Sequence, residues 1–253
     1  AMAQIMYYYK YPEKGKGYNR WTYYPNDDKT GTTIRVNFTN TYDWNNMLPT
    51  YKKGNYNAAQ ANAIATLMKD CGGAVSMQYS ASGSGAYASD ACIALRNNFK
   101  YHDGLKLYTR SFYTLDEWMD LIYRELNDEC PILYGGATKN GAGHEFVFDG
   151  YDKDGLVHVN WGWNGTNNGY FDVTLLNSDQ GTYSEGQNMV VVRLPNDERY
   201  TQTRSSLWGI EGLELTLTNN VLRANQLTAY NIDADNFTGE VQLIAEDVHT
   251  HSV

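Results

Sequence analysis

The fold is decided by two stretches of sequence, Gly143-His-Glu-Phe-Val-Phe-Asp-Gly150 and His158-Val-Asn-Trp-Gly-Trp163. In both, apolar residues recur over a short run that Gly, Asn and Asp turns enclose, which is the pattern of antiparallel strands. The same kind of pattern covers, in chain order, Pro131–Tyr134, His144–Tyr151, Leu156–Trp163, Tyr170–Leu176 and Asn188–Leu194. The chain after Cys130 is therefore predicted to form an antiparallel sheet.

The chain before Cys130 has the hydrophobic period of helices instead. Helices are predicted over residues 1–11 with a stop at Pro12, from Asn57 to about Cys71, over Ala88–Phe99, and from Thr114, where Glu117 completes a capping box. Because the helices precede the strands and do not alternate with them, the pattern predicts an α+β fold and not a parallel βαβ sheet. No N-cap residue precedes the first helix, so we expect its first turn to lie upstream of Ala1, in a longer protein.

The composition excludes several classes of protein. The chain has 253 residues, and 20 Lys and Arg residues against 29 Asp and Glu residues give it a net charge of −9. A nucleic-acid surface would need a basic stripe and a membrane span would need ~18 consecutive apolar residues, so we expect neither. The 22 tyrosines and 23 glycines instead suit strands, turns and aromatic-lined clefts.

The pattern changes again after the predicted sheet. Pro195-Asn-Asp-Glu198 closes the first unit, and strand patterns follow at Leu213–Leu217, Gln226–Ile232 and Glu240–Ala245. We therefore expect one domain over residues 1–197 and a second, all-β module over residues 198–253. This module is too short to close a β-sandwich by itself, so it is predicted to be partial.

None of the three cysteines has the surroundings that a nucleophile needs. A reactive thiolate favours the N-terminus of a helix beside a positively charged histidine. Cys71 ends a helix, Cys92 lies on a helix's apolar stripe, and Cys130 precedes Pro131. Their odd number without a CxxC spacing fits neither a disulfide framework nor a zinc site. We interpret all three as core residues and expect no metal and no organic cofactor.

His144 is the strongest candidate for catalysis among the five histidines. It follows Gly141-Ala-Gly143 and opens an apolar strand, so a reactant can reach an imidazole whose backbone the strand holds. A general-base imidazole also needs a polar partner that holds its tautomer and an apolar lid that excludes water. Asn160 and Trp161 can supply these roles if their strand is the neighbour. An ordinary core role is the alternative for both Trp161 and Trp163.

Several motifs together resemble those of the streptopain family of papain-like cysteine peptidases, the C10 type. They are Ala3-Gln-Ile-Met6, Tyr11-Pro12, Tyr42-Asp-Trp-Asn-Asn-Met-Leu-Pro-Thr-Tyr51 and the two stretches quoted above, in the family's order. The resemblance runs from Ala1 to about Leu194. It implies a papain-like α+β domain and a cysteine endopeptidase that hydrolyses peptide bonds through a Cys/His acyl-enzyme pathway without a cofactor.

The resemblance also implies roles for individual residues. The family's nucleophilic cysteine begins the helix whose later residues read Ala-Gln-Ile-Met, so it would lie just upstream of Ala1, and this chain alone would be inactive. The family's histidine corresponds to His144, and the tryptophan that shields it corresponds to Trp161, with Asn160 beside it. The implied substrate-binding residues are Ser82, Gly83, Ser84, Gly85, Gly143, Glu145 and Trp163.

Partners and location follow from the same resemblance. We expect protein or peptide substrates, an inhibitory propeptide, and a secreted or cell-surface location in a bacterium. The all-β module resembles the C-terminal sandwich modules of large surface peptidases from anaerobic Gram-negative bacteria.

Two other functions stay open at this point. The same Cys/His geometry serves other acyl-transfer enzymes, such as transglutaminase-like or amidase domains, since a fold does not decide the reaction. The aromatic cleft also suits a catalytically dead module that binds peptide or glycan. The residues just upstream of Ala1 separate these cases: a Gly-Cys pair supports an enzyme, and a serine or alanine supports the binding module.

Overall fold

The computed structural model describes residues 1–25, 30–198, 208–218 and 221–231. The chain forms two units, Ala1–Arg204 and Ser205–Val253. The residues that line the cleft of this protein all belong to the first unit. The second unit contributes an antiparallel hairpin of β11 (Trp208–Thr218) and β12 (Val221–Asn231). The predicted strand Glu240–Ala245 lies outside the described residues, so the partial sandwich stays a prediction.

A six-stranded antiparallel sheet is the centre of the first unit. Its strands lie in the order β3 (Leu107–Thr109), β10 (Glu185–Val191), β4 (Ile132–Ala137), β5 (Gly143–Tyr151), β6 (Val157–Asn160) and β7 (Gly169–Phe171). In the β4–β5 hairpin, Gly136 pairs with His144 and Ile132 pairs with Phe148. The predicted antiparallel sheet and the α+β class are therefore confirmed.

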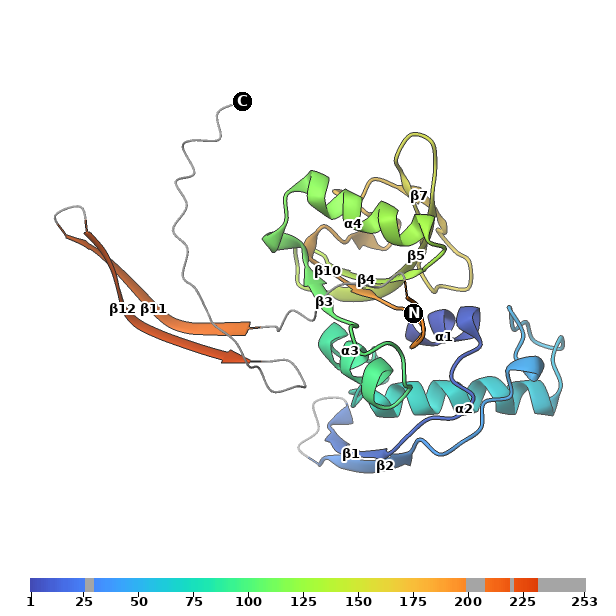
Figure 1. Ribbon diagram of the computed structural model, residues 1–253. Helices are drawn as coiled ribbons and strands as arrows, with labels where there is room; N and C mark the ends of the chain where they lie inside the picture. The colour runs from blue at the N-terminus through green and yellow to red at the C-terminus, as the bar shows by residue number, and fades with distance from the viewer. Residues whose placement is uncertain (26–29, 199–207, 219–220, 232–253) are drawn as a thin grey trace. The chain divides into compact units, whose positions relative to one another are not determined.

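Helices cover both faces of this sheet, as Figure 1 shows. The helix α4 (Leu115–Asn127) packs on one face, and α1 (Met2–Tyr9), α2 (Ala58–Ala74) and α3 (Ala88–Asn97) lie on the other. Successive strand residues point to opposite faces. Phe146 and Phe148 join the cluster beneath α4, whereas Val147 joins the cluster around α1 and α2.

The capping signals explain where two of the helices begin. Thr114 caps α4, since its Oγ1 accepts a hydrogen bond from the N–H of Glu117 at 3.3 Å and the Glu117 carboxylate accepts one from the N–H of Thr114 at 2.8 Å. Asn57 and Gln60 form an equivalent box at the start of α2. The predicted starts of both helices are confirmed.

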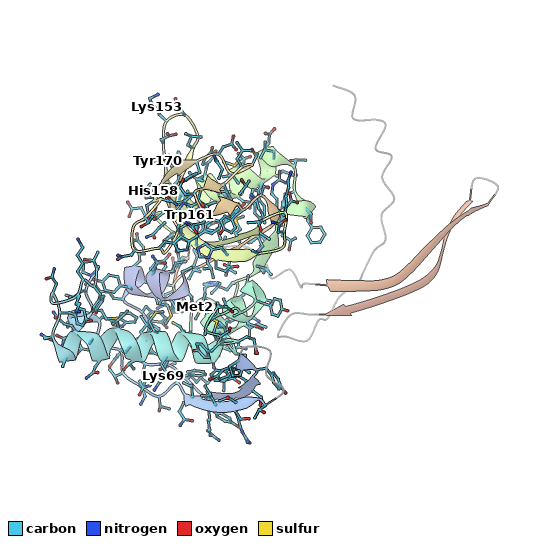
Figure 2. All side chains as sticks on the ribbon, turned by 180° about the vertical axis from the view of Figure 1, so that it is seen from behind. Met2, Lys69, Lys153, His158, Trp161 and Tyr170 are labelled. Carbon is cyan, nitrogen blue, oxygen red and sulfur yellow. The ribbon has the colours of Figure 1, made fainter. Side chains whose placement is uncertain are left out.

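The helix α1 lies between the sheet and α2 (Figure 1). It buries Met2, Ile5 and Met6, and the Cys71 Sγ of α2 lies 3.6 Å from the Met6 Sδ. Figure 2 shows Met2 in this middle layer. Because apolar residues meet α1 from two sides, packing holds the helix in place although it has only 8 residues.

The structure differs from the sequence expectation at several short elements. A hairpin of β1 (Tyr18–Tyr23) and β2 (Thr32–Asn37) was not predicted, and it packs against α2 through Val36. β7 ends at Phe171, before the predicted Leu176, because Asp172 starts a turn by accepting the N–H of Thr174 at 2.8 Å. The remaining short elements are η2 (Trp44–Asn46), η3 (Arg110–Phe112), β8 (Asn177–Ser178) and β9 (Gly181–Thr182). None of the helices in the described part of the chain has the length and apolar character that crossing a bilayer requires.

A buried ion-pair network ties the segment after β10 to α4. Arg193 is 2 % exposed and donates two hydrogen bonds to Glu125, at 2.6 and 3.0 Å. It donates further bonds to Asp128 at 2.7 Å and to Asp197 at 3.2 Å. Glu125 is 1 % exposed, and Arg124 is a second partner whose Nε donates a hydrogen bond to its carboxylate at 3.2 Å.

The substitution Arg193→Ala should lower the free energy of unfolding by about 3 kcal/mol, because it leaves the buried Glu125 carboxylate with the half-exposed Arg124 as its remaining cationic partner. Equilibrium urea unfolding measures the change. The control Lys153→Ala removes a surface ion pair with Asp154, whose side chains are 87 % and 66 % exposed, and should cost less than about 1 kcal/mol. An equal loss in the two variants would contradict a structural role for the Arg193 network.

Candidate active site

His144 lies near the beginning of β5, where β4 supplies glycines as its neighbours. A methyl group on Gly136, its partner across the hairpin, would collide with the carbonyl oxygen of Tyr183. The absence of a side chain at Gly136 therefore lets the Tyr183 segment approach the hairpin. The Tyr183 ring lies 5.7 Å from the His144 imidazole and forms one wall around it.

The tautomer of His144 follows from its hydrogen bond. Nε2 of the imidazole lies 2.8 Å from the backbone carbonyl oxygen of Trp161. A carbonyl oxygen only accepts, so Nε2 carries the hydrogen and Nδ1 keeps the lone pair that a base needs. Burial lowers the pKa of His144 below its ordinary 6.5, although the hydrogen bond to Trp161 acts in the opposite direction. The imidazole is therefore neutral at pH 7 and able to accept a proton.

Two parallel indoles shield this hydrogen bond. The Trp163 ring stacks on the imidazole with centroids 4.7 Å apart, and the Trp161 ring lies 6.4 Å from it. The two indoles stack on each other at 5.2 Å with an interplanar angle of 7°. Trp161 is fully buried (Figure 2). The expected contact between His144 and Trp161 is confirmed, but the ring nearest to the imidazole is that of Trp163.

Asn160 does not hold the imidazole. Its Oδ1 accepts hydrogen bonds from Nε2 of Gln4 and from the N–H of Gly162, both at 3.1 Å. The expectation that the Asn160 amide orients His144 is thus wrong, because the nearer acceptor is a backbone carbonyl. Asn160 instead ties α1 to the turn that carries Trp161.

The N-terminal end of α1 opens into a cleft beside His144. Ala1, Met2 and Ala3 line this cleft of about 730 Å³ together with Gly143, His144 and Glu145. No side chain in the described residues caps this end of the helix. The N–H groups and the positive end of the helix dipole favour a negative charge there, such as a thiolate or an oxyanion.

The small-residue loop contributes only part of the expected cleft wall. Ser84 and Gly85 line the cleft, whereas Ser82 and Gly83 lie outside its lining. Two backbone hydrogen bonds between Gln78 and Gly85, at 2.9 and 3.1 Å, close the loop. Trp163 also lies outside the lining, since its ring covers His144. The substrate-contact roles of Ser82, Gly83 and Trp163 therefore lack support from the cleft geometry.

Glu145 follows His144 in the strand and faces the α1 side of the sheet with Val147. A methyl group on Gly135, its partner in β4, would collide with Oε1 of Glu145, so this glycine makes room for the carboxyl group. Oε2 is buried without a hydrogen-bond partner among the described residues. Burial raises the pKa of Glu145 from its ordinary 4.5 to about 7, although the amino group of Ala1 acts in the opposite direction.

The cysteines lie where a thiol is inert. Cys71, Cys92 and Cys130 are between 2 % and 6 % exposed. Burial raises the pKa of Cys71 to about 12, so the thiol stays protonated at neutral pH. Cys71 borders the cleft, but its sulfur packs against Met6.

His144 and the N-terminal end of α1 line one cleft. The sequence profile of the Peptidase C10 family matches residues 1–171. The chain belongs to the peptidase C10 family. The thiol protease/hemagglutinin PrtT of Porphyromonas gingivalis is 39 % identical over 200 residues, which are 76 % of this chain and 22 % of that protein. Streptopain of Streptococcus pyogenes is 38 % identical over 180 residues, which are 70 % of this chain and 45 % of that protein.

Solved structures agree with the family. The active wild-type interpain A cysteine protease of Prevotella intermedia is 45 % identical and superposes with a TM-score of 0.69 over 75 % of this chain and 79 % of that chain. A prointerpain A fragment with one cysteine replaced by alanine gives a TM-score of 0.65 over 75 % of this chain and 60 % of that chain, also at 45 % identity. The expected family and its papain-like α+β fold are therefore confirmed. The chain spans less than half the length of the PrtT and streptopain sequences.

Asn188 is a polar residue of the cleft that the sequence pattern did not indicate. It opens the apolar run of β10, and only the sheet order places β10 beside β4. Through this pairing Asn188 lies opposite Gly135 and next to the carboxyl group of Glu145. A polar residue at a strand opening is common, so the sequence carried no sign that distinguished it.

The raised pKa of Glu145 should make the stability of the protein depend on pH. The folded protein holds this proton more tightly than the unfolded chain, so the stabilisation is complete below pH 4.5 and is lost as the pH rises through about 7. The variant Glu145→Gln has no charge to bury. The melting temperature of this variant minus that of the unmodified protein should therefore increase by a few degrees as the pH is raised from 5 to 8. Circular dichroism measures both melting temperatures. The control Asp154→Asn, at an exposed position, should show no such change.

Proposed function

We propose that this chain is the larger part of the catalytic domain of a cysteine endopeptidase whose nucleophile lies just upstream of Ala1. The observation that carries the proposal is the hydrogen bond from Nε2 of His144 to the Trp161 carbonyl, since it leaves Nδ1 as a base beside the open end of α1. One further turn on α1 would extend the helix by about 5.4 Å past Ala1. A cysteine at that helix start would have a lowered pKa and a histidine close by.

The reaction would follow the acyl-enzyme pathway. Nδ1 of His144 takes the thiol proton, and the thiolate attacks the carbonyl carbon of the scissile peptide bond. Backbone N–H groups at the start of the extended helix hold the oxyanion. The protonated imidazole then gives its proton to the leaving amine, and the C–N bond breaks. A water molecule, deprotonated by His144, attacks the thioester, and the acid product leaves as the thiol is restored.

Three residues would act on His144 without touching the substrate. The Trp161 carbonyl holds Nε2–H, the Trp163 ring keeps water from this bond, and Asn160 joins the turn between them to Gln4 of α1. In this proposal they are positioning residues. Gly143, Ser84 and Gly85 would form walls along which an extended peptide lies.

The relatives support the peptidase over the other functions that the sequence left open. PrtT is named a thiol protease and interpain A a cysteine protease. The name prointerpain A supports an inhibitory propeptide as a partner, besides protein or peptide substrates. The bacterial sources of these proteins support a bacterial enzyme, and its proposed place of action is outside the cell or on its surface.

In the complete protein, His144→Ala should lower kcat/KM for a peptide substrate at least ~10²-fold, because the base and acid of the pathway are lost. The matched control is His158→Ala, which also removes an imidazole. His158 of β6 pairs with Asp149 and contacts Tyr170 of the edge strand β7, away from Met2 (Figure 2), and it is not among the residues that line the cleft. This variant should keep its kcat/KM. Near-normal hydrolysis by His144→Ala, measured with a fluorogenic peptide, would remove His144 from the mechanism.

Residues 1–253 alone should hydrolyse no peptide and should resist an epoxide inactivator of cysteine peptidases, because their three thiols are buried. With the upstream segment joined, mass spectrometry should find the adduct on the upstream cysteine only. An adduct on Cys71, Cys92 or Cys130, with none upstream, would place the nucleophile elsewhere. Incorporation of an amine in place of hydrolysis would favour a transglutaminase-like enzyme, and an upstream serine or alanine would favour a binding module.

A further inference from the structure

Glu145 differs in charge from the rest of the cleft wall. Most of the lining is apolar or small, with Met68, Val75, Met77, Ala91 and Leu133 among its members. Among the described lining residues, Glu145 is the only acidic side chain, and none is lysine or arginine. The cleft therefore holds a carboxyl group with no lysine or arginine of the described lining to balance it.

Two side chains of the cleft lining each hold a buried acceptor atom. Oε2 of Glu145 and Oδ1 of Asn188 both lack a hydrogen-bond partner among the described residues. Their side chains converge over Gly135, where an added methyl group would lie 2.9 Å from Cδ of Glu145 and 3.1 Å from Nδ2 of Asn188. Buried acceptors cost free energy unless a donor reaches them. A group with several N–H donors would satisfy both.

We propose that Glu145 and Asn188 recognise the cationic side chain of a lysine or arginine in the substrate peptide. The aliphatic stem of such a side chain would pack on the methionines and Leu133, while its charged end reaches the two acceptors. A neutral apolar side chain would fill the same walls but leave both acceptors unpaired, which is how a polar subsite discriminates. The inference rests on the proposed peptidase function.

The position of Glu145 limits which substrate residue it selects. Glu145 is the immediate neighbour of His144, and adjacent Cα atoms lie about 3.8 Å apart. An extended peptide advances about 3.3 Å per residue. The recognised side chain therefore belongs to a substrate residue within two positions of the scissile bond. The side chains of the substrate residues on either side of it point in the opposite direction, because successive side chains of an extended peptide alternate.

The charge of the group fits a cationic ligand. Burial raises the pKa of Glu145 to about 7, and the positive amino group of Ala1 acts in the opposite direction. In the complete enzyme the nitrogen of Ala1 would be part of a peptide bond, so the positive charge that it contributes here would be absent. An arriving lysine or arginine would then supply the only full positive charge next to the carboxylate, apart from that of His144 when it is protonated.

The test uses the complete enzyme with its upstream cysteine and a set of peptides that share one sequence. Lysine, arginine or the apolar norleucine stands in turn at each of the two positions on either side of the scissile bond. The unmodified enzyme should show at least a tenfold higher kcat/KM for lysine or arginine than for norleucine at one position. Glu145→Gln should lose this preference, so that its kcat/KM for the lysine and arginine peptides falls to within about threefold of its kcat/KM for the norleucine peptide. Asp154→Asn, which removes the same charge from an exposed site, should keep the preference.

The outcomes separate this inference from the proposed function. Hydrolysis of the norleucine peptides without any preference for a cation, or a preference that survives in Glu145→Gln, would overturn the role of Glu145 and leave the peptidase intact. No hydrolysis of any peptide, with no inactivator adduct on the upstream cysteine, would overturn both. Circular dichroism would check that Glu145→Gln is folded. Asn188→Ala is a second, independent variant, and it should weaken the same preference.

Discussion

The hydrogen bond between Nε2 of His144 and the carbonyl oxygen of Trp161 is the interaction on which the site depends. It joins β5 to the turn after β6, and it selects the tautomer that leaves Nδ1 as a base. The bond forms because Val147 pairs with Asn160 in the neighbouring strand. A slip of one residue in this register would turn every side chain of the strand to the opposite face. The ability of His144 to act as a base therefore depends on the pairing of β5 with β6.

The helix α1 connects this sheet to the rest of the cleft. Its apolar residues pack between the sheet and α2, while Gln4 reaches Asn160 beside the turn. The helix end is thereby directed at the cleft that His144 lines. A helix this short is marginal on its own, so tertiary packing supplies the stability that its length does not.

Buried polar groups are arranged differently in the ion-pair network and in the cleft lining. Away from the cleft, Arg193 satisfies the buried carboxylate of Glu125 with two hydrogen bonds. In the cleft lining, Oε2 of Glu145 and Oδ1 of Asn188 are buried without a partner among the described residues. Such groups lower stability, and functional sites are where proteins retain them.

Local patterns in the sequence determined much of the fold. The helical period, the capping box at Thr114 and the alternation in the β4–β5 hairpin all depend on residues close in the chain, as does the strand opening at His144. The β1–β2 hairpin escaped prediction because its packing on α2 involves residues far apart in sequence. Only the tertiary structure decided that a Trp161 carbonyl, and not the Asn160 amide, holds the imidazole, and that Asn188 meets Glu145. The reason is physical: every residue has a carbonyl, so the sequence does not mark which one accepts, and strand order depends on packing across the whole sheet.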